Sequence, residues 1–249
     1  MPEQTERYQE ISMALRANCD NPAIDEIVLL NEQIYELPFE HKKIRQVNLG
    51  HRLTLQAAYD YANRHDHSAC AWCLANCDIA FDKTLNKVDF DQANVVHCLT
   101  RYERTGGGWE LFGGSNAPRP DSQDSWIFLT PQIPLVADPF TGLTASQIEV
   151  GRLGFDNKIA LILHTSGFLC KNSSKTIKTY HYHFRRDEQQ DLARMSQRLP
   201  SPYLFVEPAE IHEDPRLILC AEVMVNVEVK PEHRLETLQL QWQATFNEA

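Results

Sequence analysis

Apolar residues recur at helical spacing in three segments of the chain, and each segment predicts a helix. The segments cover residues 5–18, 53–63 and 156–165. The first ends at the breaker cluster that runs from Asn18 to Pro22, and Gly167 closes the third. Short apolar or β-branched runs stand between them and predict strands at residues 24–30, 43–49, 70–75, 95–102 and 125–129. The alternation of strands and helices predicts an α/β fold with a largely parallel sheet.

The C-terminal part of the chain follows a different pattern. Every second residue from Leu217 to Val229 is apolar, and a second alternation runs from Leu238 to Phe246. This pattern predicts a half-buried, C-terminal antiparallel β extension that pairs with a sheet edge or with another subunit of a homo-oligomer. A proline-bearing stretch at 199–202 marks the seam. We therefore expect a core domain at residues 1–198 and an extension at residues 199–249.

Composition narrows the class of protein. The chain has 34 acidic and 24 basic residues and a net charge of −10, which argues against electrostatic binding to nucleic acid or to an anionic membrane surface. No apolar run approaches the roughly 18 residues of a membrane span, and no hydrophobic signal core follows the N-terminus. Seven scattered cysteines suit reduced thiols. We expect a cytoplasmic protein.

Polar residues follow two predicted strands, Asn31-Glu32 after one and Asn76-Cys77-Asp78 after another. Ligands of parallel sheets bind outside the carboxyl ends of the strands, so these residues are candidates for a site. Residues i and i+2 leave a strand on the same side, and Asn76 and Asp78 are therefore expected to face one divalent cation together, with Asp78 at the edge of the sheet and outside the core. The alternative is that Asp78 or Asp82 caps the helix that follows.

A second candidate is the segment Tyr180-His-Tyr-His-Phe184. His181 and His183 share one face of an extended segment, as two metal ligands or two phosphate donors do. A mixture of carboxylate, amide and imidazole suits Mn²⁺ or Mg²⁺ better than a structural zinc site. The alternative is a pair of half-exposed histidines that bind nothing.

Two further polar pairs have both a structural and a functional interpretation. Asp156 and Asn157 begin a predicted helix, where they cap it or belong to a site. Gln123 and Asp124 precede a strand, where they form an ordinary turn or recognise hydroxyl groups beside an aromatic platform. The segment 106–114 holds five of the ten glycines and predicts a mobile loop that closes over a site.

Seven of these segments, taken in chain order, resemble glycosyltransferases of the GT-A, nucleotide-diphospho-sugar transferase type. The resemblance spans roughly residues 8–186 and leaves the C-terminal extension uncovered. It implies a Rossmann-like sheet, mixed but mainly parallel and flanked by helices, that binds a nucleotide-sugar donor. The enzyme would transfer the sugar to a hydroxyl acceptor, a glycan or a small molecule. The seven segments are a strand ending in Leu-Leu-Asn-Glu32, Arg52 with Tyr59–Asn63, Asn76–Asp82, a strand ending near Arg101, Ser122–Phe128, Asp156–Ala160 and Tyr180–His183.

The resemblance also implies a role for individual residues. Asn76-Cys77-Asp78 matches an Asp-x-Asp metal motif in which an amide replaces the first carboxylate. Asp78, His181 and His183 would hold Mn²⁺ or Mg²⁺, which assists departure of the diphosphate. Asp156 and Asp124 are the candidate catalytic residues, Asp156 as the general base. The candidate donor-binding residues are Asn31, Glu32, Arg52, Asn76, Arg101, Gln123 and Asn157.

Two other functions stay open at this point. One is a metal-dependent hydrolase built on Asp78, His181 and His183, which would need no acceptor. The other is a degenerate, non-catalytic GT-A-like domain that binds a nucleotide or binds a partner through the β extension. The amide at Asn76 favours this second alternative, because an amide is a weaker metal ligand than a carboxylate.

Overall fold

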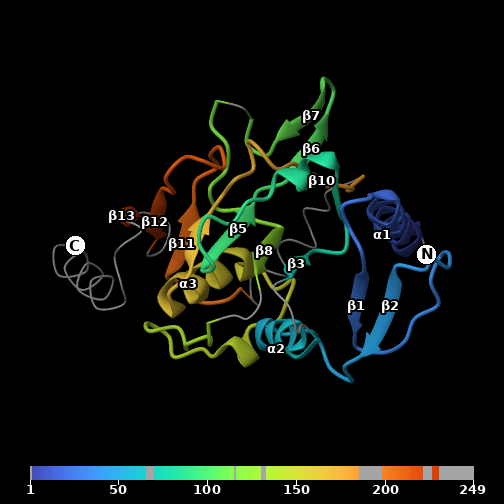
Figure 1. Ribbon diagram of the computed structural model, residues 1–249, viewed down its shortest axis with the longest axis horizontal. Coiled ribbons are helices and arrows are strands. Elements are labelled where there is room, and N and C mark those ends of the chain that lie inside the picture. Colours follow the sequence, from blue (N-terminus) through green and yellow to red (C-terminus); the bar gives the residue numbers. More distant parts are fainter. Residues whose placement is uncertain are drawn as a thin grey trace.

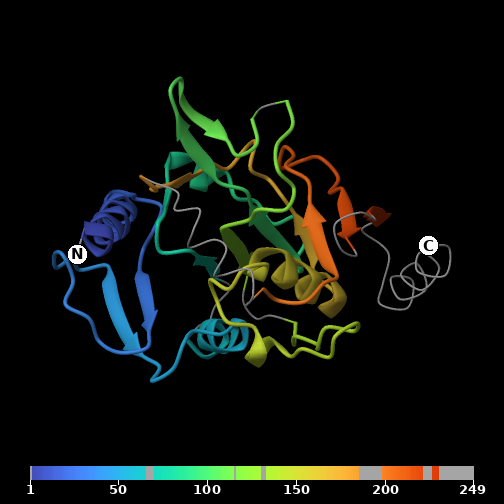
Figure 2. The same cartoon turned by 180° about the vertical axis from the view of Figure 1, so that it is seen from behind.

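The structure is a computed structural model that describes residues 2–65, 70–114, 116–129, 133–184, 198–220 and 226–229. This part of the chain has a mixed α/β fold with four small sheets (Figures 1 and 2). Its α-helices are α1 (Pro2–Asp20), α2 (Leu55–His65) and α3 (Phe155–Ser166). Two short 3₁₀ helices are η1 (Lys83–Lys87) and η2 (Ala145–Gln147). The three predicted helices are all present, with boundaries shifted by a few residues.

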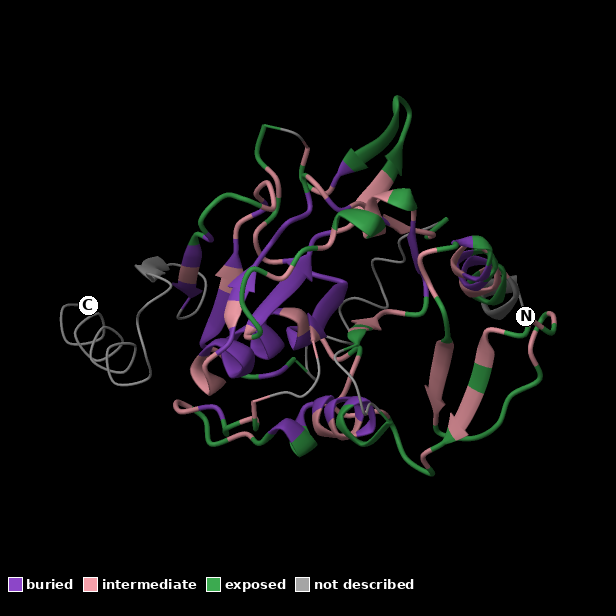
Figure 3. Ribbon diagram, viewed as in Figure 1, coloured by how far each residue is buried: buried purple, intermediate pink, exposed green. Residues whose placement is uncertain are grey.

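The central sheet has the strand order β3-β8-β5-β9. Its strands are β3 (Ala71–Ala75), β5 (Val95–Leu99), β8 (Ser125–Leu129) and β9 (Leu169–Lys171). The inner strands β5 and β8 are buried on both faces, because Trp126 and Phe128 pack into the cluster that contains α3, whereas Ile127 and Leu99 pack into a second cluster with Ile79. Burial on both faces explains why these strands are continuous apolar runs. The buried residues gather around α3, β5 and β8 (Figure 3).

The other sheets flank this centre. Strands β1 (Ile27–Asn31) and β2 (Ile44–Asn48) form a parallel pair that lies with α1 on one side of the molecule (Figure 1). A four-stranded sheet has the order β4-β10-β6-β7, with β4 (Ile79–Phe81), β6 (Tyr102–Thr105), β7 (Gly108–Leu111) and β10 (Thr179–His181). Strands β11 (Tyr203–Val206), β12 (Leu217–Cys220) and β13 (Asn226–Val229) form an antiparallel sheet on the opposite side from α1 (Figures 1 and 2).

The prediction of one mainly parallel, Rossmann-like sheet flanked by helices is wrong for the described residues. Strand β8 lies between β3 and β5 and runs antiparallel to both, and β5 with β9 is the parallel pair of the central sheet. Parallel neighbours need a crossover, usually an α-helix. Between β3 and β5 the chain has only β4 and the 3₁₀ helix η1, and between β5 and β8 it forms the β6–β7 hairpin. Alternation of apolar runs along the chain does not determine which strands become neighbours.

The glycine-rich segment 106–114 is also different from its prediction. Strand β7 occupies Gly108–Leu111 and pairs antiparallel with β6, so the segment is the turn and return strand of a hairpin rather than a loop. The hairpin projects from the body of the molecule (Figure 1). Trp109 contacts the rings of Tyr180 and Tyr182, with centroid distances of 5.1 and 5.8 Å. These ring contacts tie the hairpin to β10.

The described part of the C-terminal segment packs on the core. Leu199, Leu204, Val206, Leu217 and Leu219 all belong to the main hydrophobic cluster. The alternation between residues 217 and 229 corresponds to β12 and β13, which pair antiparallel as expected. The second alternation, at residues 238–246, lies outside the described residues. Among the helices that the structure describes, none combines the length and apolarity that a membrane crossing requires.

Candidate functional site

The turn between β3 and β4 carries the predicted metal motif. The chain leaves the central sheet at Ala75, turns at Cys77 and Asp78 and enters the neighbouring sheet at Ile79. Asn76 and Asp78 therefore do not face one ligand together, as the sequence predicts, because the turn breaks the extended backbone on which that prediction depends. The Asn76 side chain donates to Asp124 Oδ1 at 2.9 Å, whereas Asp78 faces β10.

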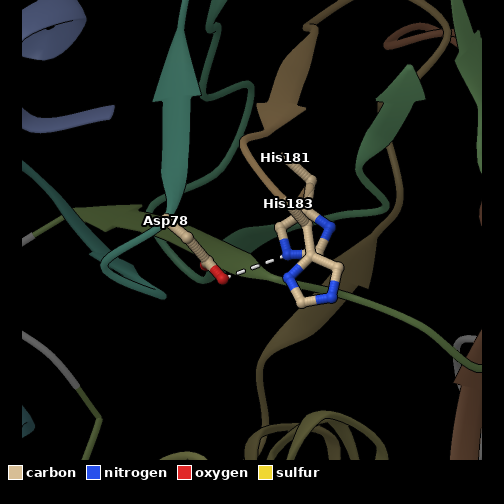
Figure 4. Close-up of side chains that lie close together, drawn as sticks. All are labelled: Asp78, His181 and His183. Carbon is tan, nitrogen blue, oxygen red and sulfur yellow. Dashed lines mark hydrogen bonds and ion pairs between the residues drawn. The ribbon is translucent and has the colours of Figure 1, made fainter. Parts of the chain in front are cut away.

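Asp78, His181 and His183 form one group, with a ligand atom from each within 4.8 Å of the others (Figure 4). The Asp78 Oδ2 atom lies 3.0 Å from His181 Nε2, and the two imidazole rings stack in parallel with a centroid distance of 5.1 Å. Backbone pairing produces this arrangement, since His181 is opposite Ile79 in the β10–β4 ladder and the Tyr182 N–H donates to the Asp78 carbonyl.

Asp78 is buried, with 7% of its side chain exposed, rather than outside the core as the sequence predicts. Helix α1 covers it. Arg7 on α1 donates to Asp78 Oδ2 at 2.6 Å and to Glu10 Oε2 at 3.0 Å. Glu10 in turn accepts the Phe184 N–H at 2.6 Å, which joins α1 to the chain just after His183. The alternative interpretation of the sequence is correct for Asp82, whose side chain caps η1.

The charges around Asp78 compensate one another. Burial alone would raise the pKa of Asp78, but His181 and Arg7 outweigh it and hold that pKa far below its ordinary range. Burial alone would lower the pKa of His181, yet its contacts with Asp78 and Glu103 raise it. Burial, His181 and Arg7 lower the pKa of His183 against the opposing effect of Glu10. His183 is therefore neutral at pH 7, the form in which an imidazole binds a metal.

A pocket of about 290 Å³ lies at the amino end of α3. It is open to solvent on one side and mixes charged, amide and aromatic side chains with backbone. The residues that line it are Asn76, Arg101, Gln123, Asp124, Trp126, Gly151, Arg152, Leu153, Gly154, Phe155 and Asp156. Two polar atoms of this lining, Gln123 Oε1 and Trp126 Nε1, are buried without a hydrogen-bond partner among the described residues. Buried polar groups in folded proteins normally have a partner, so these two atoms are candidates to bind a ligand or water.

The start of α3 positions Asp156 in this pocket. Gly154 precedes the helix with φ of +80°, a left-handed conformation that side chains rarely adopt. A Cβ at this position would also lie 3.1 Å from the ring of Tyr203. Glycine therefore allows the sharp entry into the helix that places Asp156 in the first turn, beside Phe155 and facing the pocket.

The environment of Asp156 differs from that of an ordinary helix-capping aspartate. Burial and the nearby Asp124 carboxylate raise the pKa of Asp156 to about 7, with a smaller contribution from Asp121. The backbone N–H of Asn157 and the Arg101 guanidinium oppose the rise without cancelling it. Asp156 thus exchanges a proton near neutral pH, as a general acid or base does.

A continuous set of charged contacts joins the Asp78 group to the pocket. Glu103 Oε1 lies 3.7 Å from His181 Nδ1 and accepts from Arg101 Nε at 2.9 Å. Arg101 Nη1 donates to Asp124 Oδ2 at 2.8 Å and to Ser122 Oγ at 2.7 Å. Arg101 is 13% exposed and lies between two carboxylates. The metal-ligand candidates and the raised-pKa carboxyl group therefore stand at two ends of one network.

The structure brings together some predicted residues and separates others. Both candidate catalytic residues, Asp124 and Asp156, line the pocket, and so do three donor-binding candidates, Asn76, Arg101 and Gln123. The other four donor-binding candidates, Asn31, Glu32, Arg52 and Asn157, do not line it.

The contacts of these four residues show what each does instead. Strand β1 is not part of the central sheet: Asn31 lies opposite Asn48 in the two-stranded sheet and its side chain donates to Gln46 Oε1, and Glu32 directly follows it. Arg52 donates to the Val150 carbonyl. Asn157 is buried and donates to the Asp121 carbonyl.

Three residues of the site have no role in the sequence prediction, namely Arg7, Glu10 and Glu103. The two α1 residues lie on an ordinary amphipathic helix, and nothing in their spacing distinguishes them from a solvated face. Glu103 stands two residues after Arg101, and this i, i+2 spacing is a signal that the two side chains share one face.

No family model, no curated protein and no solved structure matches the chain. The chemistry of the site therefore follows from its own side chains.

Proposed function

We propose that the protein is a glycosyltransferase that uses a nucleotide-diphosphate sugar, a hydroxyl acceptor and a divalent cation. One observation carries the proposal. A group of three metal-ligand candidates and a carboxyl group with a pKa near 7 stand at two ends of one charged network, and the carboxyl group lines a pocket. The proposal depends on this site and not on the sheet, since the small mixed sheets do not form a Rossmann-like layer.

The Asp78 group fits a divalent cation. It offers one carboxylate and two imidazoles within 4.8 Å, and the buried Asp78 Oδ1 atom has no hydrogen-bond partner among the described residues. Two imidazoles favour a first-row transition ion, so Mn²⁺ suits the group better than Mg²⁺. When bound, such a cation neutralises negative charge that develops on a departing diphosphate.

The pocket fits the sugar portion of the donor. Arg101 is held rigidly between Glu103 and Asp124 and presents a fixed positive charge. Gln123 Oε1 and Trp126 Nε1 offer an acceptor and a donor for hydroxyl groups.

Asp156 supplies the base. A carboxylate with a pKa near the working pH both exists in the deprotonated form and accepts a proton effectively. It would take the proton of the acceptor hydroxyl as that oxygen attacks the sugar. The pocket wall that carries Asp156 also carries Asp124, which keeps the pKa of Asp156 high and binds Arg101.

The first test is ligand binding followed by turnover. UDP-, GDP-, dTDP- and CMP-sugars are screened for an increase in Tm, with and without Mn²⁺, because a ligand that binds the folded state raises its stability. We expect stabilisation by a nucleoside-diphosphate sugar that requires Mn²⁺ and is lost in Asp78→Asn. Glu26→Gln, at an exposed ion pair remote from the pocket lining, serves as the matched control.

Product analysis then separates the three functions. A transferase consumes the donor faster when an acceptor is present, whereas a hydrolase releases the sugar at the same rate without one. Mn²⁺-dependent binding with no turnover on any acceptor would indicate a non-catalytic binding domain. Turnover that persists unchanged in EDTA would contradict the role of the metal.

A further inference from the structure

A positively charged side chain occupies the place where the ligand atoms converge. Arg7 Nη1 lies 2.6 Å from Asp78 Oδ2 and 3.0 Å from Glu10 Oε2. The two imidazoles border the same two oxygens, because His181 Nε2 is 3.0 Å from the Asp78 atom and His183 Nδ1 is 3.6 Å from the Glu10 atom. The guanidinium nitrogen therefore lies between the carboxylates of Asp78 and Glu10, and one imidazole borders each carboxylate.

The carboxylates of Glu10 and Asp78 are buried, whereas the Arg7 side chain is partly exposed and can turn toward solvent. The Glu10 and Asp78 side chains are 4% and 7% exposed, but the Arg7 side chain is 43% exposed. Glu10 is further held by the Phe184 N–H, which binds its other oxygen, Oε1. The Oε2 atom that Arg7 contacts is thus the one that Glu10 can offer to a metal. Release of Arg7 toward solvent would leave the group of Asp78, His181 and His183 in place, with the Glu10 carboxylate beside His183.

Charge balance also favours an ion over the arginine. Arg7 brings one positive charge to the two carboxylates of Asp78 and Glu10. A divalent cation would balance both carboxylates. The unpartnered Asp78 Oδ1 atom is a second sign that the group is incomplete with Arg7 alone.

We propose that Glu10 is the fourth protein ligand of the metal site and that Arg7 is an intramolecular competitor for the ion. The guanidinium holds the ligands together when the metal is absent and leaves them when it binds. This inference extends the proposed function, since it concerns the same metal site, but it predicts metal binding alone. Helix α1 therefore contributes both a ligand and the group that opposes loading.

The test is calorimetric titration with Mn²⁺ alone, with no nucleotide present, on the full chain and four variants. Arg7→Gln removes the competing charge and is expected to bind Mn²⁺ about tenfold more tightly or better, since a charge-assisted hydrogen bond no longer has to be broken. Glu10→Gln removes a ligand and is expected to bind about tenfold more weakly or worse. Arg16→Gln and Glu6→Gln, on the same helix, are the matched controls, because Arg16 instead contacts the ring of Phe39 and Glu6 lies one turn before Glu10.

Thermal unfolding gives a readout that a purely structural ion pair would not produce. In EDTA we expect Arg7→Gln to have a lower Tm than the wild type, because two buried carboxylates then face each other. Added Mn²⁺ should raise the Tm of this variant by more than it raises the wild-type Tm. If Arg7→Gln has lost the fold altogether, Arg7→Lys, which keeps the charge but not the shared contact, is expected to show an intermediate gain in affinity.

The outcomes separate this inference from the proposed function. Wild-type affinity in both Arg7→Gln and Glu10→Gln, or weaker binding in Arg7→Gln, would overturn the inference and leave the transferase proposal standing. The expected opposite shifts without turnover of any nucleotide sugar would overturn the transferase proposal and leave the inference standing. Absence of Mn²⁺ binding in the wild type and in Arg7→Gln would overturn the inference and remove the metal from the proposed function.

Discussion

Asp78 and Asp156 are both largely surrounded by protein, yet their carboxyl groups have opposite acid–base properties. Arg7 and His181 donate directly to Asp78 and keep its pKa far below the ordinary value. Asp156 faces other carboxylates and receives a backbone N–H as its opposing contact, so its pKa rises to about 7. Desolvation pushes both values upward, and the difference therefore comes from the partners that each carboxylate finds.

The comparison assigns different tasks to the two aspartates. A carboxylate that stays ionised at every physiological pH suits a cation, whereas one that exchanges its proton near neutrality suits acid–base chemistry. Arg101 connects the two environments, because it binds Asp124 in the pocket and Glu103 beside His181. Substitutions at Asp78, Asp156 or Arg101 test whether the low pKa of the first aspartate and the high pKa of the second can change independently.

The largest expected effect is on turnover in Asp156→Asn. Loss of the base should lower kcat by at least about a hundredfold, while the donor binds with nearly unchanged affinity. In the wild type, the rate should rise as the pH increases through about 7, since the deprotonated form of Asp156 is the active one. Initial rates between pH 5 and 9, together with donor titrations, measure both quantities. Equal turnover in the variant would exclude Asp156 as the base.

The next effect is on stability in Arg101→Met. This change removes the cation from the buried Asp124 and the partly buried Glu103 and should lower the free energy of unfolding by about 3 kcal/mol. Because Arg101 lowers the pKa of Asp156, its removal should also shift the rising limb of the pH–rate profile to higher pH. Urea denaturation and the rate profile check the two parts. If the rising part of the pH–rate profile stays at the same pH in this variant, Arg101 does not influence the pKa of Asp156.

A smaller effect is the pH dependence of stability in Asp156→Asn. The folded pKa of about 7 lies above the model-peptide value of 3.8, so the unfolded chain releases this proton first as the pH rises. Ionisation of Asp156 therefore costs stability progressively between about pH 4 and pH 7, and the cost stays constant above that range. A pKa difference of about 3 units corresponds to about 4 kcal/mol in full, but Asp156 is only partly buried and solvent screens its charge, so the variant should gain about 1–2 kcal/mol relative to the wild type between pH 4 and pH 8. Denaturation curves at the two pH values measure the gain, and a difference that does not change with pH would contradict the raised pKa.

The smallest expected effect is on stability, at an exposed ion pair that serves as a reference for the buried one at Arg101. Arg45 and Glu26 form an ion pair at 2.7 Å, but both side chains are nearly half exposed. Arg45→Ala should change the free energy of unfolding by less than about 0.5 kcal/mol. A change as large as that in Arg101→Met would mean that burial does not explain the difference between the two networks.

The helices and much of the candidate site could be predicted from the sequence, because both depend on local spacing. The apolar stripe of α2 and the glycines that flank α3 mark these helices directly. The i, i+2 spacing of His181, the last residue of β10, and His183, just after it, correctly places both imidazoles beside Asp78.

The remaining features depend on contacts between distant parts of the chain. The antiparallel position of β8, the separation of β1 from the central sheet and the packing of α1 over Asp78 are tertiary choices that local periodicity does not encode. The sequence therefore does not identify Arg7 and Glu10 as residues of the site. Asn76 and Asp78 were wrongly placed on a common ligand because a turn, rather than a continuing strand, separates them.

The pairing of β10 with β4 makes the candidate metal group sensitive to chain length. Along residues 180–183 imidazoles alternate with phenols, and Trp109 contacts Tyr180 and Tyr182 while His181 and His183 meet Asp78. A shift of one residue in the β10–β4 register would place phenol rings, instead of both imidazoles, beside Asp78. Insertion or deletion of one residue just before Thr179 should therefore erase the group entirely, whereas point substitutions only weaken it.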